Sequence, residues 1–310
     1  MSACHIPQAA DAVLSCTRRQ WLQQSAATLT VALSPAAWAA ISTPSAPAAQ
    51  RVVSLGGAMT EVIYALGAQE ALVATDTTSL YPEAAARLPK VGYFRQLSAE
   101  GVLSLKPDAV IGAGEAGPAM VLEQLRAAGV RVELVPTTHN WEEVQNKVQR
   151  VGQVLGRQAQ AQALLAQLDL QWQATQALVQ QHRQHSTRPR ALFILAHNGS
   201  PMVAGTGTAA HALIEMAGAR NVVTAFEGYR PLTAEAMAAV APQVIVTSTQ
   251  GIEAMGGIDA FWRRPELALT PAYATRALVV MEASHLLGFG PRLPSAVRTL
   301  HSHIVQKVAS

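Results

Sequence analysis

Residues 140–186 read NWEEVQNKVQRVGQVLGRQAQAQALLAQLDLQWQATQALVQQHRQHS, and this stretch decides how the chain is organised. It contains no proline, and its abundance of Gln, Ala and Leu favours an α-helix. Asn140 is expected to cap the first turn, with Glu143 three residues later completing a capping box. Glycines weaken the middle, so we predict one helix to about Leu155, a break near Gly156 and a second helix of about 27 residues, about 40 Å long.

Apolar residues recur along both predicted helices at the three-to-four spacing of one buried stripe. The stripe comprises Val144, Val148, Val151, Leu155, Leu164 or Leu165, Leu168, Trp172 and Leu178 or Val179. On either side of it, short continuous apolar runs alternate with amphipathic segments, a pattern typical of parallel sheets covered on both faces. The sequence therefore predicts two α/β lobes, residues 40–140 and 189–310, joined by a helical spine over 141–188.

Composition limits the classes of protein that the chain can represent. Its 310 residues are enough for two hydrophobic cores. Charged residues make up 14% and the net charge is +3, too small and too scattered to indicate a nucleic-acid partner. The sequence contains no GxSxG, HExxH or P-loop motif, so it gives no support to a hydrolase, a zinc protease or a nucleotide triphosphatase.

The first 39 residues have the pattern of a twin-arginine signal peptide. The motif TRRQWL at 17–22 precedes a mildly apolar run, and Ala37-Trp38-Ala39 fits the small-x-small cleavage rule. The alternative is an amphipathic N-terminal helix of the mature protein. Both cysteines, Cys4 and Cys16, would leave with the leader, and a chain without thiols suits an oxidising compartment. We therefore expect an exported, periplasmic, soluble protein.

Two similar segments occupy corresponding places in the two predicted lobes. GYFRQLSAE spans 92–100 and GYRPLTAE spans 228–235, with one residue dropped after the tyrosine. Each precedes a predicted short helix and then a strand. The two lobes would then be related by a pseudo-twofold, with the two loops facing each other across a cleft, where ligands of doubly wound sheets bind.

These loops carry the strongest candidates for ligand binding, Tyr93 and Arg95. A guanidinium within hydrogen-bonding distance stabilises a phenolate, and an anionic oxygen is a good ligand for Fe(III). Tyrosinate is also a recognised axial ligand of haem iron. The alternative is a half-buried tyrosine whose hydroxyl meets the backbone.

Tyr229 and Arg230 would present a second aromatic face and a second cation to the same cleft, and two arginines suit a ligand with carboxylates.

His197 is a further candidate ligand residue. It follows the predicted strand RALFILA, at the start of the predicted loop HNGSPMVAGTG, where a strand end would direct it into the cleft. Imidazole is a good ligand for haem iron. The alternative is a capping or loop-stabilising role.

A glycine-rich segment offers a different class of function. GAGEAG at 112–117 follows a predicted strand and opens a helix, and Glu133 lies about twenty residues on, which imitates a dinucleotide-binding fingerprint. On this basis the alternative is an exported NAD(P)-dependent oxidoreductase. However, the strand is not the first of its lobe, and Glu133 lies within a strand instead of just after it.

From about Arg51 to Gly290, the chain resembles the periplasmic haem-binding proteins of bacterial ABC-type hemin importers. The segments that carry the resemblance are VGYFRQLSAEGVLSLKPD at 91–108, PMVAGTGTAA at 201–210, EGYRPLTAEA at 227–236 and LGFGPR at 287–292. These proteins belong to the wider group with the class III periplasmic binding protein fold, which includes vitamin B12 and ferric-siderophore binders. The resemblance implies two Rossmann-like lobes with parallel sheets, bridged by one long helix.

The resemblance also implies roles for individual residues. Tyr93 would be the axial haem ligand, with Arg95 hydrogen-bonded to its phenolate, and His197 looks similar to a histidine by which some relatives hold a second, stacked haem. Glu100 and Glu235 look like the acidic pair that docks on arginines of the membrane permease. The alternative for these two is that of ordinary carboxylates at helix N-termini, where the dipole favours them.

We therefore expect a monomeric carrier, not an enzyme, that binds ferric haem (Fe(III) protoporphyrin IX) in the cleft between the lobes and delivers it to an ABC importer in the inner membrane. The haem would be the transported ligand and not a resident cofactor. Within the same fold, the alternative is a siderophore or cobalamin carrier.

Overall fold

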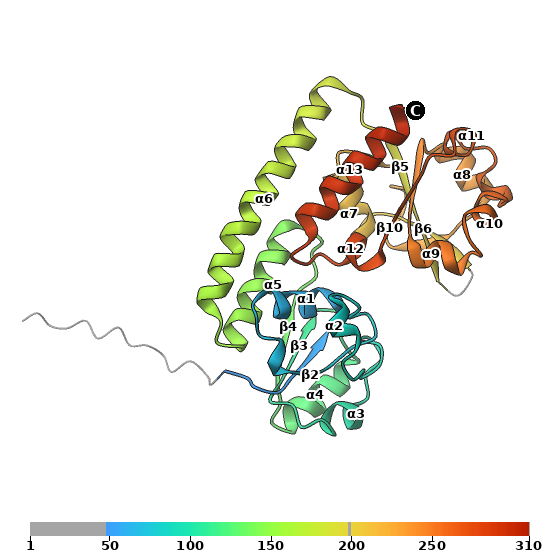
Figure 1. The fold of residues 1–310 in the computed structure, drawn as a ribbon. Helices are drawn as coiled ribbons and strands as arrows, with labels where there is room; N and C mark the ends of the chain where they lie inside the picture. The colour runs from blue at the N-terminus through green and yellow to red at the C-terminus, as the bar shows by residue number, and fades with distance from the viewer. Residues whose placement is uncertain (1–47, 198–199, 310) are drawn as a thin grey trace, which may run out of the picture. The chain divides into compact units, whose positions relative to one another are not determined.

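The structure is a computed structural model that describes residues 48–197 and 200–309, apart from the side chains of His197, Ser200 and Ala236 (Figure 1). The predicted signal peptide, residues 1–39, lies outside the described residues. The described residues belong to one compact unit that contains two sheets. We call the two sheets with their helices the N-terminal and C-terminal lobes.

The N-terminal lobe is built on an all-parallel sheet. Its strands are β1 (Val52–Leu55), β2 (Leu72–Thr75), β3 (Ala109–Ala113) and β4 (Arg131–Val135), in the order β2-β1-β3-β4. All four residues of β1 are buried, as expected for a strand covered on both faces. The predicted parallel α/β arrangement of this lobe is therefore confirmed.

Short helices connect and cover these strands. They are α1 (Gly57–Ala65), the 3₁₀ turn η1 (Gln69–Ala71), α2 (Glu83–Ala86), α3 (Ala99–Leu103) and α4 (Ala119–Ala127). The buried residues of this lobe form two clusters. In the first, Met59 and Ile63 on α1 pack with β1, β3 and the spine, and in the second, Phe94 packs with α4. Parallel strands place all their carboxyl ends at one edge of the sheet, and the loops that carry the candidate ligands start there.

The spine consists of two helices, α5 (Trp141–Val154) and α6 (Gln158–His185), and the predicted break near Gly156 is confirmed. Gly156 has φ +65°, a left-handed conformation that favours glycine. The Asn140 side chain accepts a hydrogen bond from the Glu143 backbone N–H at 2.9 Å, as predicted. The Glu143 carboxylate accepts hydrogen bonds from the backbone N–H groups of Thr138 and His139. The second half of the capping box therefore uses the two residues before Asn140 instead of Asn140 itself.

The predicted apolar stripe is buried along most of the spine. Val144, Val148 and Val151 on α5 and Leu168 and Trp172 on α6 are all buried. The last residue of the stripe, predicted as Leu178 or Val179, is Val179, which is 4% exposed, while Leu178 is 40% exposed. In Figure 1, α6 extends beside α13 (Leu293–Ala309), and the Thr175 hydroxyl donates to the Pro294 carbonyl at 3.2 Å. The spine therefore contributes to the cores of both lobes.

The C-terminal lobe has a mixed sheet of order β10-β9-β5-β6-β8, where a parallel one was predicted. Strands β5 (Arg190–His197), β9 (Val244–Ser248) and β10 (Leu278–Met281) are parallel, and β7 (Arg220–Asn221) pairs with β5. In contrast, β6 (Ser200–Ala204) and β8 (Tyr229–Pro231) are antiparallel additions. The segment after β5, predicted as a loop, thus returns as a hairpin strand. Its Pro201 and flanking glycines concealed this, because such residues usually indicate turns.

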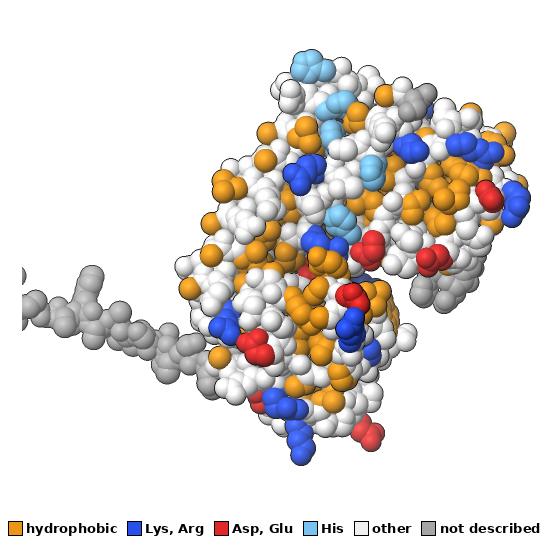
Figure 2. Space-filling view, viewed as in Figure 1, with side chains coloured by type: hydrophobic (Ala, Val, Ile, Leu, Met, Phe, Trp, Pro, Cys, Tyr) orange, Lys and Arg blue, Asp and Glu red, His pale blue; other side chains and the backbone are white. Residues whose placement is uncertain are grey.

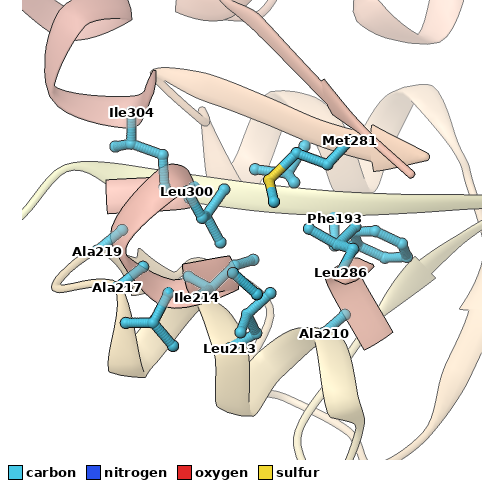
Figure 3. Packing of buried hydrophobic residues seen from close by; sticks show 14 of the residues in the cluster. Phe193, Ala210, Leu213, Ile214, Ala217, Ala219, Met281, Leu286, Leu300 and Ile304 are labelled. Carbon is cyan, nitrogen blue, oxygen red and sulfur yellow. The ribbon is translucent and has the colours of Figure 1, made fainter. Parts of the chain in front are cut away.

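Helices cover both faces of this second sheet. They are α7 (Ala209–Met216), α8 (Ala234–Val240), α9 (Thr249–Ala254), α10 (Ile258–Trp262), the 3₁₀ turn η2 (Pro265–Leu267), α11 (Pro271–Thr275), α12 (Ala283–Leu287) and α13. Figure 3 shows one core, in which Leu213 and Ile214 of α7 and Leu300 of α13 meet Phe193 of β5. None of the helices within the described ranges is long and apolar enough to cross a membrane.

Candidate ligand-binding site

The Tyr93 loop connects α2 to α3 at the carboxyl edge of the N-terminal sheet. Gly92, with φ +95°, turns the chain, and its carbonyl accepts from the Thr77 N–H at 3.0 Å. Phe94 is 9% exposed and packs into the lobe, whereas Tyr93 is 36% exposed. Alternate residues of the loop thus point in opposite directions, and the buried Phe94 anchors the loop so that the Tyr93 phenol faces outward.

Arg95 lies directly against the Tyr93 phenol. Its Nη1 donates to the Tyr93 Oη at 2.8 Å, and its guanidinium covers the Phe94 ring at 4.8 Å from the centroid. The sequence predicted this pair, and the structure brings the two side chains together. A phenol oxygen that is exposed and receives a hydrogen bond from a cation is suited to act as an anionic ligand.

Glu115 and Thr137 extend this arrangement, although no sequence motif connects them with Tyr93. Glu115 Oε1 lies 3.5 Å from Arg95 Nη2, and its other oxygen, Oε2, accepts from the Thr137 hydroxyl at 2.5 Å. Burial raises the pKa of Glu115. The hydrogen bonds from Thr137 and from its own backbone N–H, with the charge of Arg95, outweigh burial and hold that pKa below its ordinary value. The carboxylate is therefore ionised at neutral pH.

The same edge of the sheet holds His139, for which the sequence suggested no partner. Its ring meets the Phe289 ring edge-on at 5.4 Å between centroids. Burial lowers the pKa of the His139 imidazole, and the nearby Glu143 and Glu115 carboxylates only partly offset this. The imidazole is therefore neutral at neutral pH, and Arg95 remains the principal cation beside the phenol. No sequence signal short of a contact prediction would have found this neighbour.

Tyr229 and Arg230 lie on the edge strand β8 and do not repeat the Tyr93 arrangement. Tyr229 is half-buried, packs against the core of its own lobe and hydrogen-bonds with Thr208. Burial raises the pKa of its phenol, while the charge of Arg95 acts on it in the opposite direction. Arg230 is exposed, with its guanidinium 4.6 Å from the centroid of the Phe226 ring.

Three other predicted site residues remain without a tested role. His197 is the last residue of β5 and pairs with Ser200, but its side chain is outside the described part of the structure. Glu100 and Glu235 are exposed in the first turns of α3 and α8. Their positions suit helix dipoles equally well, so docking stays a prediction.

The glycine-rich segment is explained by packing within the lobe. A Cβ on Gly112 would lie 3.0 Å from the Leu134 side chain, and one on Gly114 would lie 3.1 Å from the Val135 carbonyl oxygen. Glu133, which would bind a ribose in the dinucleotide alternative, forms an ion pair with Arg150 at 3.6 Å. Close contacts between neighbouring strands therefore account for the two glycines without a nucleotide.

An ion pair connects the two lobes beside this site. Arg292, in the loop before α13, donates to both carboxylate oxygens of Glu61 on α1, at 2.9 and 2.5 Å. Its guanidinium also lies 3.8 Å from the centroid of the Tyr81 ring. Glu61 is 6% exposed, and burial raises its pKa although Arg292 opposes this. This bidentate pair explains the arginine of the LGFGPR segment.

The surface seen in Figure 2 carries basic and acidic side chains that are interspersed, in agreement with the small net charge. Among the residues that the structure describes, no three His, Cys, Asp or Glu side chains are grouped closely enough to hold a metal ion.

Comparison with known families identifies the class. Residues 52–284 match the family model described as periplasmic binding protein, so the chain belongs to the periplasmic binding protein family, a family of substrate-binding proteins. The vitamin B12-binding protein of Yersinia pestis (strain Pestoides F) is 28% identical over 273 residues, which cover 83% of this chain and 91% of that protein.

Solved structures narrow the comparison. The periplasmic heme-binding protein BhuT, in complex with two hemes, is 45% identical with a TM-score of 0.81, covering 84% of this chain and 100% of that one. RhuT from Roseiflexus sp. RS-1, a periplasmic heme-binding protein in apo form, is 36% identical with a TM-score of 0.79, covering 84% and 99%. A periplasmic heme-binding protein from Pseudomonas aeruginosa is 37% identical with a TM-score of 0.75, covering 82% and 92%. These similarities confirm the predicted class III fold.

Proposed function

We propose that this protein captures ferric haem in the periplasm and delivers it to an ABC importer, as a carrier and not an enzyme. The observation that carries the proposal is the exposed Tyr93 phenol with the Arg95 guanidinium 2.8 Å from its oxygen. The similarity to BhuT at 45% identity over the whole length of that chain supports haem as the ligand.

In this proposal, the chain supplies one anionic oxygen and a set of cations. Tyr93 would coordinate the ferric iron, and Arg95 would stabilise the phenolate form by its hydrogen bond. Haem also carries two propionates, for which the guanidinium groups of Arg230 and Arg95, both exposed, are suitable partners. Tyr229 and Phe226 would contact the porphyrin, and His197 would act only on a second haem.

Titration with hemin tests the proposal. We expect the purified protein to shift the Soret band and to produce the charge-transfer band of a high-spin ferric phenolate complex. Tyr93→Phe should abolish that charge-transfer band. Tyr81→Phe is a matched control, because Tyr81 is also an exposed phenol of the same lobe next to a guanidinium, that of Arg292. An unchanged hemin titration by the Tyr93 variant would eliminate iron coordination by this residue.

The second candidate function is a cobalamin carrier, favoured by the similarity to the vitamin B12-binding protein. Cobalamin binding would not need an anionic phenol, because the corrin cobalt already carries its own axial ligands. Competition decides between the two: cyanocobalamin should leave the hemin titration unchanged at equal concentrations. Displacement of hemin by cobalamin would favour the cobalamin carrier. The same assay with a ferric siderophore tests the siderophore carrier, the other alternative within this fold.

Export and delivery belong to the same proposal. Residues 1–39 would direct the folded chain through the twin-arginine pathway, and the monomeric carrier would dock through Glu100 and Glu235 on the permease. Both carboxylates are exposed, one per lobe. We expect the double substitution Glu100→Arg and Glu235→Arg to leave hemin binding unchanged while abolishing haem-dependent growth. Growth at the wild-type rate would contradict the docking role, whatever the outcome of the hemin titration.

A further inference from the structure

The Tyr93 loop is fastened to the loop that follows β3. The Gly117 N–H donates to the Phe94 carbonyl at 2.9 Å, and the Leu97 N–H donates to the Gly117 carbonyl at 3.0 Å. These two backbone hydrogen bonds flank Arg95. The loop after β3 therefore sets the position of the Tyr93 loop as well as that of Glu115.

Glu115 lies between two groups that satisfy different oxygens of its carboxylate. Oε1 faces Arg95 Nη2 at 3.5 Å, and Oε2 accepts from the Thr137 hydroxyl at 2.5 Å. Thr137 follows β4, the strand paired with β3. The carboxylate is thus held from the neighbouring strand end, and its other oxygen, Oε1, faces the terminal guanidinium nitrogen that does not contact the phenol.

We propose that Glu115, held by Thr137, is a positioning residue that fixes the Arg95 guanidinium so that Nη1 points at the Tyr93 oxygen. Arg95 is half-exposed and carries a long, flexible side chain, so its geometry needs a second contact to be maintained. A planar guanidinium that is bound through one terminal nitrogen directs the other in a defined direction. This inference rests on the proposed binding of haem by Tyr93.

A purely electrostatic role for Glu115 predicts the opposite effect. Its negative charge has the same sign as that of a phenolate and of an anionic ligand, so its removal would strengthen binding if charge alone mattered. If position matters, removal allows Arg95 to leave the phenol, and binding weakens. The sign of the effect of Glu115→Ala therefore separates the two roles.

The experiment is hemin titration of the full mature protein carrying Glu115→Ala, Glu115→Gln, Arg95→Ala, or Arg95→Ala combined with Glu115→Ala. We expect Glu115→Ala to weaken binding about fivefold and to shift the phenolate charge-transfer band, the size of effect that partly exposed ion pairs produce. Glu115→Gln should restore most of the affinity, because its amide oxygen can accept from Arg95 Nη2 while its amide nitrogen donates to the Thr137 hydroxyl, whose oxygen can also accept. In the Arg95→Ala background, Glu115→Ala should have no further effect.

Glu133→Gln serves as the matched control, because it neutralises another glutamate paired with an arginine in the same lobe. It should leave affinity and spectrum unchanged. Tighter binding by Glu115→Ala, or an equal loss in the presence and absence of Arg95, would overturn the positioning role. If instead Tyr93→Phe binds hemin like the wild type, the proposed binding of haem by Tyr93 itself fails. This outcome can be distinguished from the two results that would overturn only the positioning role of Glu115.

Discussion

The Tyr93 loop and the strand β8 carry similar short motifs, and the structure gives their tyrosines and arginines different surroundings. In the N-terminal lobe the phenol is exposed and its oxygen receives a hydrogen bond from Arg95. In the C-terminal lobe the Tyr229 phenol is half-buried and bonded to Thr208, and Arg230 lies over the Phe226 ring. One copy thus presents an exposed phenol oxygen that is hydrogen-bonded to a guanidinium, and the other presents packed aromatic surface with an exposed cation over the Phe226 ring.

The spacing between tyrosine and arginine explains this difference. Tyr93 and Arg95 lie two residues apart in a turn that a hydrogen bond from the Gln96 N–H to the Tyr93 carbonyl closes at 2.8 Å, and both side chains are exposed while Phe94 between them is buried. Tyr229 and Arg230 are adjacent on β8, and adjacent residues of a strand point to opposite faces. The segment with one residue fewer between tyrosine and arginine therefore does not bring its phenol and its guanidinium together. Whether the two side chains form a pair depends here on their spacing, since both segments contain the same two residue types.

The largest expected effect comes from removing one phenol at a time. Tyr93→Phe should weaken hemin binding by at least about a hundredfold, since loss of a direct ligand exceeds the usual effect of losing its hydrogen-bond partners. Tyr229→Phe should weaken it by less than about threefold and retain the phenolate band. The affinities and spectra of both variants test this contrast, and equal losses would show that the two motifs do share one task.

The two arginines should differ by a smaller factor. Arg95→Ala removes a charge-assisted hydrogen bond to the phenolate and should weaken hemin binding about tenfold, together with a shift of the charge-transfer band. Arg230→Ala removes only an exposed cation near the propionates, for which about threefold is expected and no shift of the band. The comparison is contradicted if Arg230→Ala moves the band as far as Arg95→Ala does.

The smallest effect concerns alkaline pH and the burial of Tyr229. Burial raises the pKa of this phenol above its ordinary value of 10.0, so the folded state binds its proton more tightly than the unfolded state. The resulting stabilisation is complete below about pH 10 and is lost as the pH rises through the raised value. Thermal unfolding should show that Tyr229→Phe reduces the loss of stability above pH 10. An identical decline in the wild type and the variant would show that Tyr229 is accessible to water.

Much of this fold could be predicted from periodicity. The stripe from Val144 to Val179 determined the spine, because a helical pattern that continues on both sides of the break near Gly156 has few alternatives. The hairpin strand β6 was missed since Pro201 and the nearby glycines resemble a loop, although β6 lies between β5 and β8 and pairs with both. Propensity therefore failed where an interior strand begins with residues that usually indicate a turn.

The candidate site could be predicted only where its members are near in sequence. Tyr93 and Arg95 share one loop, and their chemistry indicated the pair. Glu115 and Thr137 are 22 residues apart and meet because β3 and β4 are neighbours in the sheet. Strand order supplied that contact, and no local pattern encodes it. The same applies to His139, whose aromatic partner Phe289 comes from the other lobe.

The bidentate link between Arg292 and Glu61 has a consequence for how cargo enters and leaves. Any movement that draws α1 away from the start of α13 would break both hydrogen bonds of this buried pair and would admit water to the two charges. The cost is therefore less than the roughly 3–5 kcal/mol that is lost when one partner of a buried pair is removed and the other stays buried. The link favours the arrangement in which α1 and the start of α13 lie together, so entry or exit of cargo that separates them must break it.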